Sequence, residues 1–282
     1  MEIILKSKFM KDELNASFLF GLKDLSTYDN VLSLEELEFL DTSRIYIAID
    51  KNIFNDDLLL LEKSLIKLNQ LKVKGIFFYD LAVLSLSKKL NINVPLIWNQ
   101  NFLVTNYKTC KYYQKDGVSG AVLSSEITID EIKEIGENID FDLFVNIFGY
   151  QLMGASKRNL VSNYFEYIDE ENFDNFNYMI ERGNKYPILE NKIGTKIFTK
   201  DVLCGIRYLN ILKESGIKHI ILSDDLLDED IFSKVYDIFN KALDCDLSSE
   251  ELLECEKEIN SIIPTSLGFF NKETIYKVKR ND

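Results

Sequence analysis

Residues 148–165, FGYQLMGASKRNLVSNYF, bring together side chains that could bind an anion. The segment leaves an apolar run, breaks at a glycine and presents Lys157 and Arg158 between Ser156 and Ser162. A guanidinium can hold a carboxylate or phosphate through two parallel hydrogen bonds, whereas a lysine acts as a point charge. Because no acid, histidine or cysteine lies in the segment, it predicts binding without an evident catalytic group. A solvated loop with ordinary surface charge is the alternative interpretation.

Further polar residues follow short apolar runs, where strands are expected to end. They are Asp50, Asp80, Asn99, Gln100, Asn101, Ser125, Glu126, Glu190, Asn191, Ser223, Asp224 and Asp225. If the strands are parallel, these side chains line one pocket. Aspartate, serine and asparagine at such junctions often cap the next helix, and we favour capping or solvation for the four aspartates. Glu126 and Glu190 are the candidates for an acidic catalytic pair, and His219 is interpreted as structural.

The charge and the N-terminus limit the class of protein. The formal net charge is −13, which argues against broad, non-specific affinity for nucleic acid but leaves room for a local basic patch. The first residues lack the long apolar run and cleavage site of a signal peptide, and no apolar run approaches the length of a membrane span. The sequence therefore predicts a cytoplasmic protein.

The four cysteines, Cys110, Cys204, Cys245 and Cys255, are scattered and accompany a single histidine. A metal or cluster site needs closer spacing or partner histidines. The sequence predicts reduced thiols and no metal site, with Cys204 on the buried face of a helix.

Apolar strand-like runs alternate with segments of helical period along the chain. The expected strands are 2–5, 16–22, 44–49, 75–79, 94–98, 121–124, 143–148 and 219–222. The expected helices are 34–40, 57–71, 81–90, 129–135, 202–214, 227–243 and 249–262, with a short hairpin over 188–189 and 196–198. This alternation indicates parallel βαβ units.

Eight expected strands in one domain predict a (β/α)8, TIM-like barrel that is irregular at its N-terminal side, where the first connection is brief. A doubly wound open sheet is the main alternative, but no GxGxxG follows the first strand. The predicted division is a single barrel domain over residues 1–245, with a C-terminal helix and tail, residues 246–282, packed on it.

Several segments resemble the collagenase-like peptidases, family 32 of unknown catalytic type (the peptidase U-32 family). AVLSSEITIDEIKEI at 121–135 resembles that family's LSxELsxxEI segment, and WNQNFLVTNY at 98–107 matches at Gln100, Thr105 and Asn106. FYDLAVL at 78–84 and residues 194–225 are similar to further family segments. Together these cover most of residues 44–240.

The family signature, His-Gly-x-x-Cys-x-x-x-Ser-Gly-x-Cys-x-x-Ser, aligns without gaps from position 148. Gly149, Ser156, Arg158 and Ser162 remain in place, whereas Phe148, Leu152, Lys157 and Asn159 replace the histidine, first cysteine, second glycine and second cysteine. The later cysteine pair of many members has no counterpart between Asn163 and Pro187. Since relatives hold an iron–sulfur cluster through such cysteines, no cluster is expected here.

The resemblance implies a role beside the family's RNA-modifying members. In that role the chain is an accessory or paralogous subunit supporting tRNA or rRNA base hydroxylation, with a longer family paralogue as partner. A prephenate-like anionic ligand, or RNA, then binds at Gln100, Asn106, Ser156, Lys157, Arg158 and Ser162. A peptidase and a non-catalytic ligand-binding barrel are the alternatives, and the sequence leaves catalytic competence open.

Overall fold

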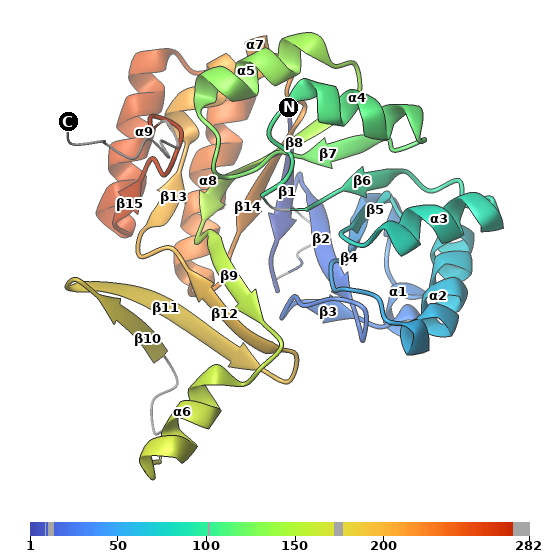
Figure 1. Cartoon of the computed structure of the whole chain (residues 1–282). Helices are drawn as coiled ribbons and strands as arrows, with labels where there is room; N and C mark the ends of the chain where they lie inside the picture. Colours follow the sequence, from blue (N-terminus) through green and yellow to red (C-terminus); the bar gives the residue numbers. More distant parts are fainter. Residues whose placement is uncertain (9, 11–13, 101, 172–176, 273–282) are drawn as a thin grey trace, which may run out of the picture.

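Eight parallel strands close into a barrel in the computed structural model, which describes residues 1–8, 10, 14–100, 102–171 and 177–272 (Figure 1). In barrel order the strands are β1 (Glu2–Lys6), β2 (Ser17–Leu22), β4 (Ile45–Ile49), β5 (Gly75–Phe78), β6 (Leu96–Trp98), β7 (Gly120–Val122), β8 (Asp142–Gly149) and β14 (His219–Ser223). Parallel pairing of β14 with both β1 and β8 closes the ring. The predicted barrel is confirmed.

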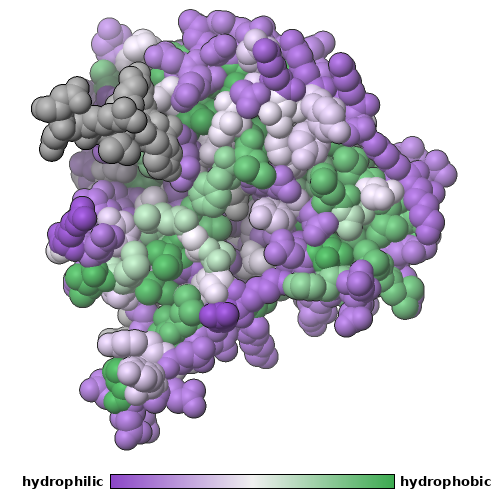
Figure 2. Space-filling view, viewed as in Figure 1, coloured by the Kyte–Doolittle hydropathy of each residue, from purple (hydrophilic) through white to green (hydrophobic). Residues whose placement is uncertain are grey.

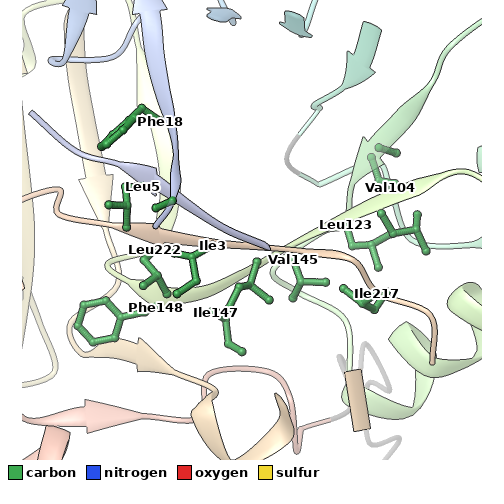
Figure 3. Packing of buried hydrophobic residues seen from close by; sticks show 14 of the residues in the cluster. Ile3, Leu5, Phe18, Val104, Leu123, Val145, Ile147, Phe148, Ile217 and Leu222 are labelled. Carbon is green, nitrogen blue, oxygen red and sulfur yellow. The ribbon is translucent and has the colours of Figure 1, made fainter. Parts of the chain in front are cut away.

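Alternating side chains of each strand face two different cores. One face points into the barrel, where Tyr46, Phe77 and Phe144 meet edge to face with ring centroids 5.1–5.8 Å apart. The other face packs outward against the helices, as Ile3, Leu5 and neighbouring residues do in Figure 3. Because both faces are buried, the strands read as continuous apolar runs, which is why they could be located from the sequence.

Helices cover the outside of the barrel (Figure 1). They are α1 (Leu34–Leu37), α2 (Leu58–Leu71), α3 (Leu81–Leu90), α4 (Tyr107–Lys115), α5 (Ile129–Asn138), α7 (Leu209–Glu214), α8 (Glu229–Asp244) and α9 (Ser249–Ile262). Three short 3₁₀ segments are η1 (Thr42–Arg44), η2 (Asn55–Asp57) and η3 (Ile206–Tyr208). Capping boxes begin α1, α5 and α9, so their starts were readable from local sequence.

The helix predicted over residues 202–214 is wrong in its first half. Val202–Cys204 form strand β13, which pairs antiparallel with β8 and parallel with β15 (Thr265–Ser266). The chain then makes the η3 turn, and only Leu209–Glu214 form α7. Cys204 is therefore buried on a strand rather than on a helix. Pairing partners from two distant segments override the local helical pattern here.

The connection between β1 and β2 contains no helix among its described residues, in keeping with the predicted irregularity. β1 and β2 pair only through Ile4 with Ser17 and Leu5 with Phe18. The two-residue strand β3 (Val31–Leu32) adds to the far end of β2. Thr27 and Tyr28, in the loop after β2, line the cavity that is described with the candidate site.

A second, antiparallel sheet interrupts the barrel between β8 and β13, and we call residues 152–198 the lid. It comprises β9 (Leu152–Ser156), α6 (Leu160–Ile168), β10 (Asn177–Glu181), β11 (Asn184–Asn191) and β12 (Gly194–Phe198), with sheet order β10-β11-β12-β9. Figure 1 shows this sheet beside the C-terminal ends of the barrel strands, with α6 projecting away. The predicted hairpin corresponds to β11 and β12. Residues 148–165, for which a solvated loop was the alternative interpretation, form the end of β8, strand β9 and the first part of helix α6.

The turn between β11 and β12 requires glycine. Gly194 has a φ of +139°, and a Cβ atom there would lie 2.0 Å from the carbonyl oxygen of Ser156. This close approach joins the hairpin to β9 and holds the lid sheet together.

The C-terminal segment packs α9 against α8 and η3 through Leu252, Cys255 and Ile259, which are all buried. Phe270 is also buried and meets the ring of Tyr208 edge to face at 5.5 Å. Within the described residues, no helix is both long and apolar enough to cross a membrane.

Candidate functional site

A cavity of about 510 Å³ lies at the C-terminal ends of the barrel strands, between the barrel and the lid. Its polar lining comes from nearly every barrel strand and from the lid: Lys6, Thr27, Tyr28, Asp50, Asn52, Tyr79, Asn99, Gln100, Ser125, Asn146, Tyr150, Gln151, Ser156, Lys157, Asn191, Thr195, Lys196, Ser223 and Asp225. Apolar residues such as Leu19, Val122 and Ile221 form its floor, on top of the inner barrel core. This volume suits a small molecule.

Lys6 and Asp225 form an ion pair on one wall of the cavity. Lys6 ends β1, Asp225 follows β14, and the two strands are neighbours in the ring. The Lys6 ammonium also lies 4.3 Å from the centre of the Tyr28 ring. Burial acts against the charge of Asp225, but Lys6 outweighs it and lowers the pKa of this carboxyl. The Asp225 carboxyl is therefore ionised near neutral pH.

Asp50, at the end of β4, holds the loop after β2 in place. Its carboxylate accepts hydrogen bonds from the Ser26 hydroxyl, the Thr27 hydroxyl and the Thr27 backbone N–H, the last at 2.7 Å. This loop presents Tyr28 to the cavity, where its hydroxyl bonds to the side chain of Asn99. Burial raises the pKa of Tyr28 well above its ordinary value, and the nearby carboxylates act in the same direction. Tyr28 is therefore a neutral phenol.

Lys196 enters the cavity from lid strand β12. Its ammonium donates to the Thr27 backbone carbonyl, so the lid and the loop after β2 meet at this bond. Burial lowers the pKa of Lys196 and Lys6 lowers it further, while Asp50, Asp225 and Asp29 act in the opposite direction. A second contact between lid and barrel joins the Asn191 amide to the Asp29 carboxylate at 2.6 Å.

Carboxamide side chains make up much of the remaining wall. Gln100 donates to the Tyr79 carbonyl at 2.6 Å and Gln151 to the Gly149 carbonyl at 2.9 Å, so each amide is oriented. Asn146 projects from β8 beside these residues and is half-buried. Three lysines and two aspartates line the cavity, which makes it locally positive in a chain of net charge −13. Since both aspartates are bonded to protein donors, the lysine ammonium groups and the remaining amide N–H groups can donate to a ligand.

The structure separates the six predicted ligand-binding residues into two groups. Gln100, Ser156 and Lys157 line the cavity, and the Lys157 ammonium lies 3.8 Å from the centre of the Phe54 ring. The other three, Asn106, Arg158 and Ser162, are not among the described lining residues. Asn106 caps α4, accepting from the Thr109 N–H at 2.9 Å, while Arg158 and Ser162 are exposed on the lid. Ligand binding by these residues stays a prediction.

The two acidic candidates have different surroundings. Glu190, on β11, accepts hydrogen bonds from the backbone N–H groups of Val161 and Ser162, at 2.8 and 3.0 Å, and from the Thr195 hydroxyl at 2.7 Å. Burial opposes its charge, but hydrogen bonds from Ser162 and Thr195 lower the pKa of Glu190. It thus holds the start of α6. Glu126 is half-buried after β7, and neither acid is among the described lining residues.

The interpretation of the strand-end aspartates as caps needs correction. Asp80 does cap α3, accepting from the Ala82 N–H at 2.9 Å. Asp50 and Asp225 instead line the cavity, because loops distant in sequence supply their partners. Asp224 is buried, accepting from the Ser7 hydroxyl at 2.8 Å, and is neither a cap nor solvated.

Several other predicted strand-end residues also line the cavity. Asn99, Ser125, Asn191 and Ser223 line the cavity, whereas Asn101 lies outside the described residues. The sequence reading missed Lys6, Tyr28 and Lys196. Lys6 carried a usable signal, because it directly follows the apolar run of the first strand; Lys196 carried none without the register of β12.

The replaced signature positions now have structural surroundings. Phe148 is fully buried and packs against Phe232 and Phe239 of α8, with ring centroids 6.5 and 6.1 Å away. Leu152 lines the cavity and Asn159 is exposed at the start of α6. Within the described ranges, no group of three or more His, Cys, Asp or Glu side chains could hold a metal ion.

Eight parallel strands around a filled core define a (β/α)8-barrel protein, and its polar cavity lies at the C-terminal ends of the strands, where such barrels carry their sites. The chain belongs to Peptidase family U32, whose sequence model matches residues 20–277. The family resemblance expected from the sequence is therefore confirmed.

Three relatives illustrate the range of the family. The chain is 31% identical over 265 residues to tRNA hydroxylation protein P2 of Bacillus subtilis (strain 168), covering 88% of this chain and 86% of that protein. It is 27% identical over 157 residues to uncharacterized protease MJ0090 of Methanocaldococcus jannaschii, covering 51% of this chain and 38% of that protein. It is also 27% identical over 150 residues to tRNA hydroxylation protein P1 of Bacillus subtilis, covering 51% of this chain and 35% of that protein.

Proposed function

We propose that this chain is an accessory or paralogous subunit that supports base hydroxylation in tRNA, with rRNA as a related substrate. The observation that carries the proposal is its 31% identity to tRNA hydroxylation protein P2 over 88% of the chain and 86% of that protein. A match over 265 residues is not restricted to a shared fold motif. Because a fold alone does not imply function, the similarity to protein P2 supports the proposal more strongly than the barrel fold does.

We further propose that the accessory role includes a longer family paralogue as partner. Protein P1 is matched over only 35% of its length, so it contains much that this chain lacks. A chain of net charge −13 is poorly suited to bind RNA phosphates over a wide surface, since that binding depends on lysine and arginine. On this proposal the partner supplies most of the RNA contact, and the protein is cytoplasmic, where tRNA is modified.

The cavity supports the proposal by offering a place for a small anionic ligand. Lys6 of β1 and Lys196 of β12 both line it, and Gln100 contributes an oriented amide. The lining carboxylates Asp50 and Asp225 already accept protein hydrogen bonds, so they compete little with a ligand for the remaining donors. An anion rich in acceptor oxygens matches this set of groups.

Deleting the gene tests the cellular role. We expect hydroxylated uridines in tRNA to decrease in nucleoside mass spectra, and a plasmid copy of the gene to restore them. Re-expression of Gln100→Ala should restore less modification, whereas Lys257→Ala, a change on the exposed face of α9, should restore it fully. An unchanged nucleoside profile in the deletion strain would contradict the proposal.

Titrating the purified chain with a small dicarboxylate tests where the anion binds. We expect Gln100→Ala to weaken binding and Arg158→Ala to leave it nearly unchanged, because Gln100 lines the cavity and Arg158 is exposed outside it. The opposite pattern would show that the anion binds at the exposed lid residues around Arg158 instead of in the cavity.

A peptidase is the second candidate, favoured by the similarity to the uncharacterized protease MJ0090. Its acidic candidate Glu190 is committed to the start of α6 by backbone hydrogen bonds, which leaves Glu126 as the residue to test. Metal-free protein should then cleave casein and lose this activity in Glu126→Gln. Absence of cleavage by the wild-type chain would remove this candidate.

A further inference from the structure

Lys196 is set apart from the other two lysines of the cavity by its surroundings. It is half-buried and bonds to a neutral backbone carbonyl, that of Thr27, which can satisfy only one of its three N–H groups. Lys6 is paired with Asp225, and Lys157 is exposed with its ammonium over the Phe54 ring. Among the described residues, no carboxylate lies within ion-pair distance of Lys196.

The Lys6 ammonium is the second part of the arrangement. Lys196 contacts Thr27 and Lys6 lies over the ring of Tyr28, so the two ammonium groups flank one dipeptide. Lys6 is held in place by its ion pair with Asp225, and its positive charge disfavours a second one on Lys196. Desolvation and a neighbouring cation are the two means by which proteins make a lysine amine nucleophilic near neutral pH.

We propose that Lys196 forms an imine with the carbonyl carbon of a small oxo acid bound in the cavity. The Nζ lone pair attacks the carbonyl carbon, and the electrons of the C=O π bond move to oxygen. The oxygen leaves as water with two of the three ammonium protons, and a C=N bond forms. Ammonium and ketone thus give iminium and water, with atoms and charge balanced and no oxidant or reductant required.

The surrounding wall selects an oxo acid rather than a plain ketone. The Lys6 ammonium and the amides of Asn146 and Gln100 line the same cavity and can donate hydrogen bonds to a carboxylate next to the reacting carbonyl. The apolar floor, with Val122 and Ile221, takes the remainder of the ligand. This inference rests on the proposed role of the cavity as the ligand site of the protein.

Reductive trapping tests the proposal on the full chain without tRNA or a partner. The protein is incubated with pyruvate and sodium cyanoborohydride, and the product is examined by intact-mass spectrometry and peptide mapping. We expect a single reduced adduct at Lys196, at least about tenfold more abundant than at any other lysine. Acetone, which has the carbonyl without the carboxylate, should give about tenfold less adduct under the same conditions.

Matched variants separate chemistry from charge. Lys196→Arg keeps a cation able to donate to Thr27 but cannot form the imine, so the adduct should disappear while the melting temperature is retained. Lys257→Arg, an exchange on the exposed face of α9, should leave the adduct at the wild-type level. If Lys196→Arg does not fold, peptide mapping of the wild-type protein still tests the proposal, because it locates the adduct without any variant.

The pH dependence provides an independent readout. The charged and titratable groups facing Lys196 are Lys6 from β1, Tyr28 and Asp29 from the loop after β2, Asp50 from β4 and Asp225 after β14. Trapping at Lys196 should persist to lower pH than trapping at exposed Lys157. No adduct, equal labelling of the two lysines, or an adduct elsewhere would overturn the proposal. If the imine proposal fails in this way but gene deletion still lowers tRNA hydroxylation, the proposed function is retained.

Discussion

The two ends of the barrel carry similar charged residues and use them differently. At the N-terminal end, Glu2 of β1 accepts hydrogen bonds from Ser17, Lys74 and His219, the last with 2.9 Å between Nδ1 and the carboxylate. At the C-terminal end, Lys6 of the same strand faces a cavity together with Lys196. One short strand therefore begins in an ion-pair network and ends at the candidate ligand site.

The difference lies in what covers each end. At the N-terminal end the partners of Glu2 come from β2, β14 and the residue before β5, and the His219 ring stacks on Phe144 with ring centroids 4.3 Å apart. At the C-terminal end the lid and the strand-end loops line a cavity, where Lys196 has no carboxylate partner at ion-pair distance among the described residues. This follows the general division of such barrels, in which the N-terminal face serves stability and the C-terminal face serves function. The predictions below test that division.

Removing Glu2 should cause the largest loss of stability. Glu2→Ala leaves Lys74 and His219, both at least half-buried, without their shared acid, and we expect a decrease of about 2–3 kcal/mol in the free energy of unfolding. Urea denaturation measures it, with the exposed Glu35→Ala as control. Anion affinity of the folded variant should be unchanged. Weakened anion binding without a loss of stability would contradict the assignment of stability to the N-terminal end and of binding to the C-terminal end.

Lowering the pH should reduce the contribution of Glu2, at the N-terminal end of the barrel, to the free energy of unfolding. Burial opposes the charge of Glu2, but bonds from His219, Lys74 and Ser17 lower its pKa from 4.5 to about 2. Because the folded-state pKa is the lower one, the stabilisation is complete above pH 4.5 and is lost as the pH falls toward about 2. Glu2→Gln should be less stable than the wild type at pH 6, and the difference should shrink toward pH about 3. A constant difference across this range would show that Glu2 does not titrate as inferred.

At the C-terminal end, a change should affect binding more than stability. Asp50→Ala removes the acceptor for the Ser26 and Thr27 hydroxyls, and we expect a loss of about 1–2 kcal/mol. The freed loop no longer presents Thr27 to Lys196, so anion binding and reductive trapping should both fall. Asp80→Ala, which removes a helix cap near another strand end, is the matched control, with a similar stability loss and retained binding.

The smallest effect is expected at the edge between lid and barrel. Lys157→Ala removes the contact of its ammonium with the Phe54 ring, worth about 0.5–1 kcal/mol at an exposed site. Thermal melting compares it with the exposed Lys192→Ala, for which no shift is expected. A larger loss would mean that the lid depends on this contact more than on the Lys196–Thr27 and Asn191–Asp29 bonds.

Local sequence was sufficient wherever the causes were local. The apolar runs of the eight barrel strands, and capping boxes such as Ser33 with Glu36, are visible within a few residues. The segment 202–214 was misread because β13 exists only through its pairing with β8 and β15. Helix α4 was missed because Asn106, its cap, was interpreted as a ligand-binding residue. The four aspartates at strand ends look alike in sequence, yet only Asp80 caps a helix while Asp50 and Asp225 line the cavity.

The sequence by itself determined the barrel, its family and the strand ends at which a site would lie, because buried parallel strands require continuous apolar runs. Only the tertiary structure decided which charges meet there. Lys6 and Lys196 are far apart along the chain, and Lys196 points inward through the pairing of β12 with β9, which shifts register at Ile197 and Phe198. A slip of one residue in that pairing would turn the lysine away from the cavity, so the residue that we place at the centre of the chemistry depends on sheet register.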